Sequence, residues 1–113
     1  MTPTELSRIC GFSESVSPMQ AKEVTGLFCG DLLSHVLAHI RPGNAWVTVM
    51  ANRNTLAVAS LTGASCVILC DGVRFNEADL KKAVEEEICI LVSDAPCFET
   101  ALQAAKALNL SSE

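Results

Sequence analysis

The segment Ser65-Cys66-Val67-Ile68-Leu69-Cys70 decides the fold class of this chain. It is apolar at almost every position and ends at a turn, Asp71-Gly72. A second run of the same kind, Ile88–Val92, follows after a segment with helical periodicity. Strands that are apolar throughout, rather than at alternate positions, are typical of a parallel sheet covered by helices on both faces. The sequence therefore predicts an α/β fold.

The remaining chain alternates strand and helix patterns. Thr2 caps a first helix, with Pro3 at its first position, Glu5 completing a capping box and Gly11 ending it. The segment 12–20 is predicted to be a loop, with room for one short strand. We expect strands at 24–29, 45–50, 65–70 and 88–92, and helices at 31–40, 53–62, 77–87 and 97–108.

These elements predict a small, mostly parallel sheet of about four strands with helices on both faces, in a single domain spanning residues 1–113. The last helix carries an apolar stripe, which includes Phe98 and Leu102 and is expected to face the core. The segment Thr55–Leu61 carries no charge at all. Since a helix that is apolar all round must be covered on both sides, we expect a second subunit to cover its outer side.

Composition excludes several function classes. Of the 113 residues, 50% are hydrophobic, and the formal net charge is −5. An acidic chain with 4% aromatic residues and no Tyr argues against a nucleic-acid partner. The apolar runs are far shorter than a membrane-spanning helix, which needs about 20 residues. The N-terminal sequence lacks the pattern of a signal peptide, so a cytoplasmic location without membrane association is expected.

Cysteine and histidine are the candidate metal ligands. Six cysteines are present, but no Cys-x-x-Cys motif occurs, and Cys66 and Cys70 would lie about 13 Å apart along one strand. Buried structural thiols are therefore expected, with a metal or cluster site as the alternative. His35 and His39 share one helix face, but further ligands are missing nearby, which favours a solvent-facing or interface pair. No metal or cofactor is predicted.

The order of motifs resembles the DRTGG-domain family. The resemblance rests on Gly30-Asp31-Leu32-Leu33-Ser34 and on the strand around Trp46, which leads into Ala57-Val58-Ala59; it covers roughly residues 1–108. It implies a fold like the N-terminal domain of HPr kinase. It also implies a regulatory or dimer-forming role, as in domains fused to phosphotransacetylase or placed between the CBS domains of pyrophosphatases. Stand-alone members are similar to proteins encoded beside iron-only hydrogenases in anaerobic bacteria, which implies a link to redox metabolism.

A ligand site is expected where the parallel strands end, because such sheets bind ligands at their carboxyl edge. The polar residues that follow the predicted strands there are Gly30, Asp31, Asn52, Arg53, Asn54 and Asp94. Helix N-termini at this edge offer amide groups to an anion, and Arg53 offers a guanidinium. The alternative is that Asp31, Asn52 and Asp94 simply cap helices.

No catalytic constellation is recognisable: the chain has no Gly-Lys pair of a phosphate loop and no Gly-x-Ser-x-Gly elbow. We therefore expect a non-catalytic regulatory or protein-interaction module that forms a homodimer. The alternative is a sensor of a nucleotide or another anionic small molecule. An enzyme or metal carrier that uses the cysteines is a third hypothesis.

Overall fold

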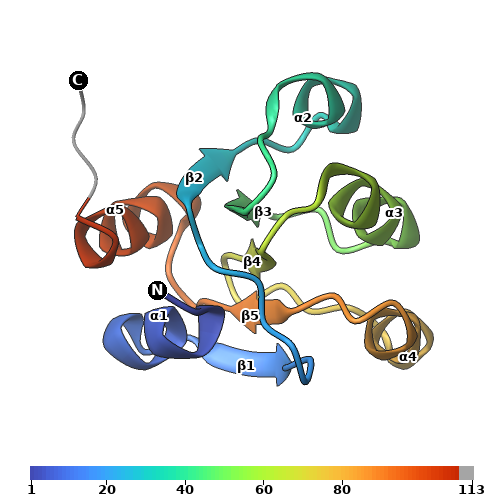
Figure 1. Ribbon diagram of the computed structural model, residues 1–113, viewed down its shortest axis with the longest axis horizontal. Coiled ribbons are helices and arrows are strands. Elements are labelled where there is room, and N and C mark those ends of the chain that lie inside the picture. The colour runs from blue at the N-terminus through green and yellow to red at the C-terminus, as the bar shows by residue number, and fades with distance from the viewer. Residues whose placement is uncertain (110–113) are drawn as a thin grey trace.

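The computed structural model describes residues 1–109 and shows one five-stranded sheet between two layers of helices (Figure 1). The predicted α/β class is confirmed, with one strand more than expected. The strands are β1 (Ser13–Val16), β2 (Gly26–Cys29), β3 (Asn44–Thr48), β4 (Cys66–Leu69) and β5 (Ile90–Val92). The helices are α1 (Pro3–Cys10), α2 (Leu33–His39), α3 (Arg53–Thr62), α4 (Glu77–Glu85) and α5 (Cys97–Ala107).

The strand order in the sheet is β1-β5-β4-β3-β2. Strands β2 to β5 are parallel to one another, and β1 pairs with β5 in the antiparallel direction. All positions of β4 and β5 are buried, as their continuous apolar sequences predict. Strand β1, by contrast, is exposed at every position except Val16. Because β2 to β5 are parallel, their carboxyl ends lie at one edge of the sheet.

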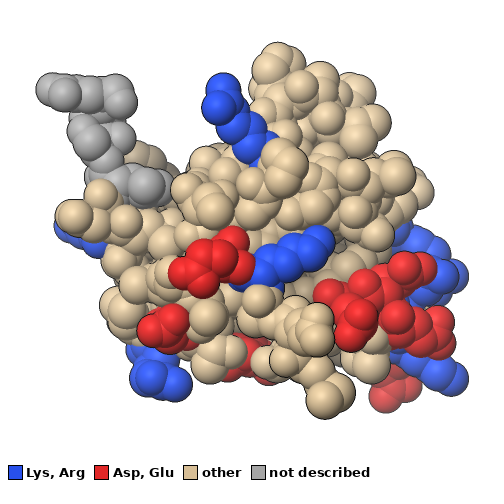
Figure 2. Space-filling model, viewed as in Figure 1, with Lys and Arg blue, Asp and Glu red and all other residues tan. Residues whose placement is uncertain are grey.

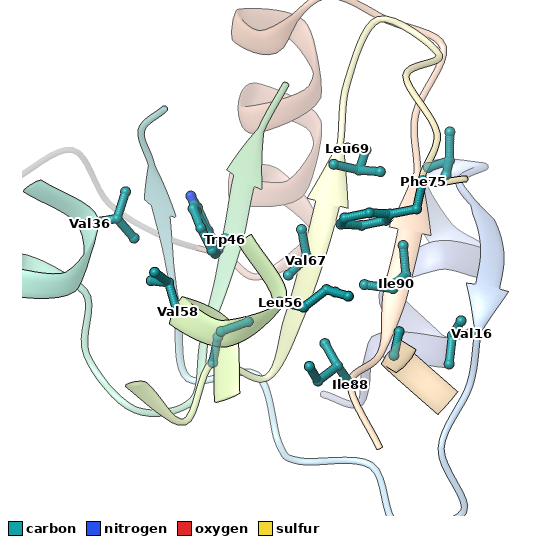
Figure 3. Close-up of a cluster of buried hydrophobic side chains, with 14 of the residues drawn as sticks. Val16, Val36, Trp46, Leu56, Val58, Val67, Leu69, Phe75, Ile88 and Ile90 are labelled. Carbon is teal, nitrogen blue, oxygen red and sulfur yellow. The ribbon is translucent and has the colours of Figure 1, made fainter. Parts of the chain in front are cut away.

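Helices α2, α3 and α4 cover one face of the sheet, and α1 and α5 cover the other (Figure 1). The core on the first face is centred on Trp46, Val67 and Ile90, with Leu56 of α3 packed over them (Figure 3). Trp46 is fully buried, and its Nε1 atom donates a hydrogen bond to the Gly30 carbonyl at 2.8 Å. Both layers predicted from the sequence are therefore present.

The termini of α1 and α3 follow local sequence chemistry closely. Thr2 and Glu5 form the predicted capping box, and Gly11 ends α1 in the left-handed conformation at φ 76°. Helix α3 has the predicted bounds. None of the helices in the described part of the chain is long and apolar enough to cross a membrane.

The predicted orientation of α5 is wrong. Phe98 and Leu102 are exposed, whereas Thr100 and Ala104 face the sheet and are fully buried. The Thr100 hydroxyl lies 2.8 Å from the Ser93 hydroxyl and donates to the Ala95 carbonyl at 3.1 Å. These bonds to the loop after β5 fix the rotation of α5, with its small residues against the sheet and its largest side chains outside.

Candidate functional site

The carboxyl edge of the sheet collects the chain segments that follow β2, β3, β4 and β5. Gly30 and Asp31 follow β2, Asn52 and Arg53 lie at the start of α3, and Asp94 follows β5. The topology therefore brings the predicted site residues to one edge, as the sequence pattern requires. Their role in ligand binding stays a prediction, and the contacts of each one indicate what it can offer to a ligand.

Asp31 does not cap α2, contrary to the capping interpretation. The N-cap of α2 is Leu32, which makes no side-chain capping bond. The Asp31 carboxylate instead accepts hydrogen bonds from the Thr48 hydroxyl at 2.8 Å and from the Val49 amide at 3.0 Å. Thr48 is fully buried and needs a partner for its hydroxyl, so Asp31 ties the end of β2 to the end of β3.

Close packing around Gly30 leaves little room for a side chain at this position. A Cβ atom at this position would lie 3.2 Å from the Phe28 ring and 3.3 Å from a Val36 methyl group, closer than ordinary contact. Its amide donates to the Val47 carbonyl at 3.2 Å, and its carbonyl accepts the bond from Trp46. The backbone between β2 and α2 is thus held against β3 on both sides of Gly30.

Asn52 and Arg53 both have partners inside the protein. Asn52 caps α3 as expected, because its Oδ1 accepts from the Thr55 amide at 3.2 Å. The Arg53 Nε atom donates to Asp79 Oδ1 on α4 at 3.0 Å, with side-chain exposures of 60% for Arg53 and 10% for Asp79. Asn54 is exposed. The predicted cation of the site is therefore directed towards a buried carboxylate, and an anionic ligand would have to share it.

Asp94 is exposed and is not the cap of α5, whose N-cap is Pro96 without a side-chain bond. The loops after β4 and β5 are instead joined by backbone hydrogen bonds. The Asp71 amide donates to the Ala95 carbonyl at 2.8 Å, and the Gly72 amide donates to the Ser93 carbonyl at 2.9 Å. Asp31, Asp71 and Asp94 give the carboxyl edge a negative charge, which is unfavourable for binding a phosphate group.

Three thiols that the sequence analysis did not connect also meet at this edge. Cys29 ends β2, Cys70 follows β4, and Cys97 is the first residue of α5. Burial, and then the proximity of Cys97, raises the pKa of the Cys70 thiol to about 12. Burial, and then the proximity of Cys97 and Asp31, raise the pKa of Cys29. Only the strand order reveals this grouping, because the three residues lie far apart in the sequence.

The two histidines form a stacked pair on α2. The ring centroids of His35 and His39 are 4.3 Å apart at an interplanar angle of 29°, and His39 Nδ1 lies 3.0 Å from the His35 carbonyl oxygen. Among residues 1–109, no three His, Cys, Asp or Glu side chains are grouped so that they could hold a metal ion together. The pair therefore has no further ligand of this kind within the described chain.

No protein-family model matches the chain, and no curated protein matches it in sequence. Among solved structures, the chain is similar to the CBS and DRTGG domains of the regulatory region of a Clostridium perfringens pyrophosphatase, in complex with the activator diadenosine tetraphosphate. The TM-score is 0.78 at 10% sequence identity, over 94% of this chain and 46% of that one. The chain thus spans about half the length of that structure, and the likeness concerns the fold.

Proposed function

We propose that residues 1–113 form a single, non-catalytic regulatory or protein-interaction domain of the DRTGG type, which acts in the cytoplasm as a homodimer. The fold likeness to a pyrophosphatase regulatory region supports the regulatory role. The link to redox or hydrogenase metabolism rests on the sequence resemblance alone. The observation that carries the dimer is a largely apolar surface on α2 and α3, which we call the α2–α3 face.

The α2–α3 face exposes large apolar side chains, and the charged residues Arg53, Lys82 and Glu86 lie along its border beside Leu61. Leu32 just before α2, Leu37 on α2 and Leu61 on α3 are 70%, 51% and 78% exposed, and Ala57 and Ser60 lie exposed beside them on α3. Helix α2 contains no Asp, Glu, Lys or Arg. Figure 2 shows almost no charged side chain over the region that these two helices occupy. An apolar surface of this kind is typical of a protein–protein interface.

The other outer helix surfaces are less suited to a self-association interface. Helix α4 carries the ion pair between Lys82 and Glu86 at its end, beside further acidic residues. Helix α5 exposes Phe98 and Leu102, but Glu99 and Lys106 flank them. Charged residues are depleted at the centre of interfaces because their desolvation is costly. We therefore infer that the second copy covers the α2–α3 face.

The test is the molar mass in solution. Sedimentation velocity of the full chain at micromolar concentration should give a dimer, and Leu61→Glu should shift it to the monomer without loss of helical circular dichroism. The matched control is Ile9→Glu, since Ile9 is a 61%-exposed aliphatic residue on α1, across the sheet. A wild-type monomer, or equal dissociation by both variants, would contradict the proposed interface.

A second candidate function, binding of a nucleotide or a similar anion, is favoured by the ligand in the similar solved structure. The proposed site is the carboxyl edge with Gly30, Asp31, Asn52, Arg53, Asn54 and Asp94. Its test is a thermal-shift titration with diadenosine tetraphosphate in the presence and absence of Mg²⁺, which can bridge carboxylates and phosphates.

Arg53→Ala should abolish the stabilisation by the nucleotide, whereas Arg41→Ala should preserve it. Arg41 is an exposed arginine in the loop that precedes β3, and therefore lies at the amino edge of the sheet. No shift with the wild-type protein, or an equal loss in both variants, would count against this site.

A further inference from the structure

The thiols of Cys70 and Cys97 are held together by the backbone around them. The loop after β4 donates two backbone hydrogen bonds to the loop after β5, from Asp71 to Ala95 at 2.8 Å and from Gly72 to Ser93 at 2.9 Å. These bonds place the residue that follows β4 beside the first turn of α5. Cys70 belongs to the apolar cluster beneath the sheet and Cys97 packs against that cluster, and the proximity of Cys97 contributes to the raised pKa of Cys70.

Two thiols held close together are the starting arrangement for a disulfide, which joins cysteines whose Cα atoms lie about 4.4–6.8 Å apart. Cys70 comes from the centre of the sheet and Cys97 from a helix, so the bond would link two elements across the carboxyl edge. Cys70 has one further contact, in which its thiol donates to the Thr48 carbonyl at 3.5 Å. The rest of its surroundings is apolar cluster.

Access to solvent differs between the two sulfur atoms. Cys97 is partly exposed at the beginning of α5, whereas Cys70 is fully buried. A reagent in solution therefore reaches Cys97 first, and Cys70 is placed to attack the product from inside. A natural comparison exists in Cys66 and Cys89, which neighbour each other in the core but are both buried. That pair offers no exposed sulfur to a reagent.

We propose that Cys70 and Cys97 are a redox-active dithiol, which a low-molecular-weight disulfide oxidises to an intramolecular disulfide. The Cys97 thiolate attacks one sulfur of the reagent RSSR, forms a mixed disulfide and releases RS⁻. The Cys70 thiol then attacks Cys97 Sγ, passes its proton to the departing thiolate and releases the second RSH. The two cysteines lose two electrons and two protons in total, and the reagent becomes two RSH.

This dithiol would make the carboxyl edge sensitive to the thiol–disulfide balance of its surroundings. The disulfide fixes the end of β4 to the start of α5, beside Asp31 and Asp94. The inference does not depend on the dimer or on nucleotide binding.

The experiment uses the full, reduced chain and oxidised glutathione. After incubation, free thiols are blocked with maleimide under denaturing conditions and counted by intact mass. The count should fall from six to four, and dithiothreitol should restore it. The oxidised protein should also melt at a higher temperature than the reduced one, because the new bond restricts the unfolded chain.

Assignment of the bond needs more than trypsin, which leaves Cys66 with Cys70 on one peptide and Cys89 with Cys97 on another. Cleavage before aspartate separates Cys89 from Cys97. In the variant Cys66→Ala, Cys70 is the one cysteine left on the other tryptic peptide, so a disulfide on that peptide belongs to Cys70. Cys66→Ala should still lose two thiols.

The variant Cys97→Ala lacks one partner of the disulfide and should keep all five of its remaining thiols. Cys97 is partly exposed, so its substitution puts folding at little risk. A glutathione adduct alone, or a disulfide that joins Cys97 to Cys29 or Cys66 to Cys89, would overturn the proposal.

Discussion

Removal of the Asp31 carboxylate tests how the carboxyl edge is held together. Asp31→Ala deletes the acceptor for the Thr48 hydroxyl at 2.8 Å and for the Val49 amide at 3.0 Å. Hydrogen bonds to a charged group contribute about 1.5–3 kcal/mol each, and the exposure of Asp31 reduces this to about 1 kcal/mol per bond. We expect a loss of about 2 kcal/mol in the free energy of unfolding, or about 8 °C in Tm for a domain of this size.

The assay is urea unfolding followed by tryptophan fluorescence. Trp46 is the sole tryptophan and is fully buried, so its emission reports the loss of the core. The midpoint should fall while the m-value is unchanged, since the same surface is exposed on unfolding. Trp46 donates a hydrogen bond to the Gly30 carbonyl, next to Asp31, so the substitution can change the tryptophan emission directly. Far-UV circular dichroism, which follows the helices, therefore provides an independent measure of unfolding.

Two substitutions at the same position separate the structural account from the capping account. Asp31→Asn keeps an acceptor in place and should lose less than half as much stability as Asp31→Ala. Asp31→Ser supplies a good helix cap, but its shorter side chain leaves Thr48 and Val49 out of reach, so it should behave like Asp31→Ala. Wild-type stability of Asp31→Ser, or a loss below about 0.5 kcal/mol for Asp31→Ala, would refute the reasoning.

Three further predictions concern stability. Asn52→Ala should lower the free energy of unfolding, measured in urea, by about 1 kcal/mol, because the Thr55 amide loses its acceptor. Asn52→Asp keeps an acceptor and should retain most of this stability. Gly43→Ala should cost more than about 1 kcal/mol, measured in the same way, because φ is +84° and the new Cβ would lie 2.5 Å from the Thr25 hydroxyl. The pKa of Glu5 is lowered by its bonds to Thr2, so its contribution is present above its unfolded-state pKa and lost as pH falls through the folded-state pKa. The stability difference between wild type and Glu5→Gln should therefore vanish on acidification, and a difference that grows in acid would contradict this.

Structural features that depend on residues close together in the sequence could be predicted. The capping box of Thr2 and Glu5 and the stop at Gly11 depend on groups three to nine positions apart, so local chemistry determines α1. The continuous apolar runs of β4 and β5 likewise predict their burial, because only a strand covered on both faces tolerates them.

Features decided by tertiary partners could not be predicted. Strand β1 has one buried residue, Val16, and exists because β5 supplies its hydrogen bonds. Asp31 stands where a cap is expected, but the buried Thr48 hydroxyl on a neighbouring strand is its partner. The candidate site follows the same division. The sequence predicts polar residues at the carboxyl edge, but only the strand order shows that Cys70 and Cys97 lie at this edge as well.

The position of β1 has a consequence for the order of folding. Ser13 pairs with Val92, and α1 packs against α5, so the first elements of the chain find their main partners among the last. Closing so long a loop is entropically costly until β4 and β5 have already paired. We therefore expect the parallel core to form first and α1 and β1 to dock onto it afterwards.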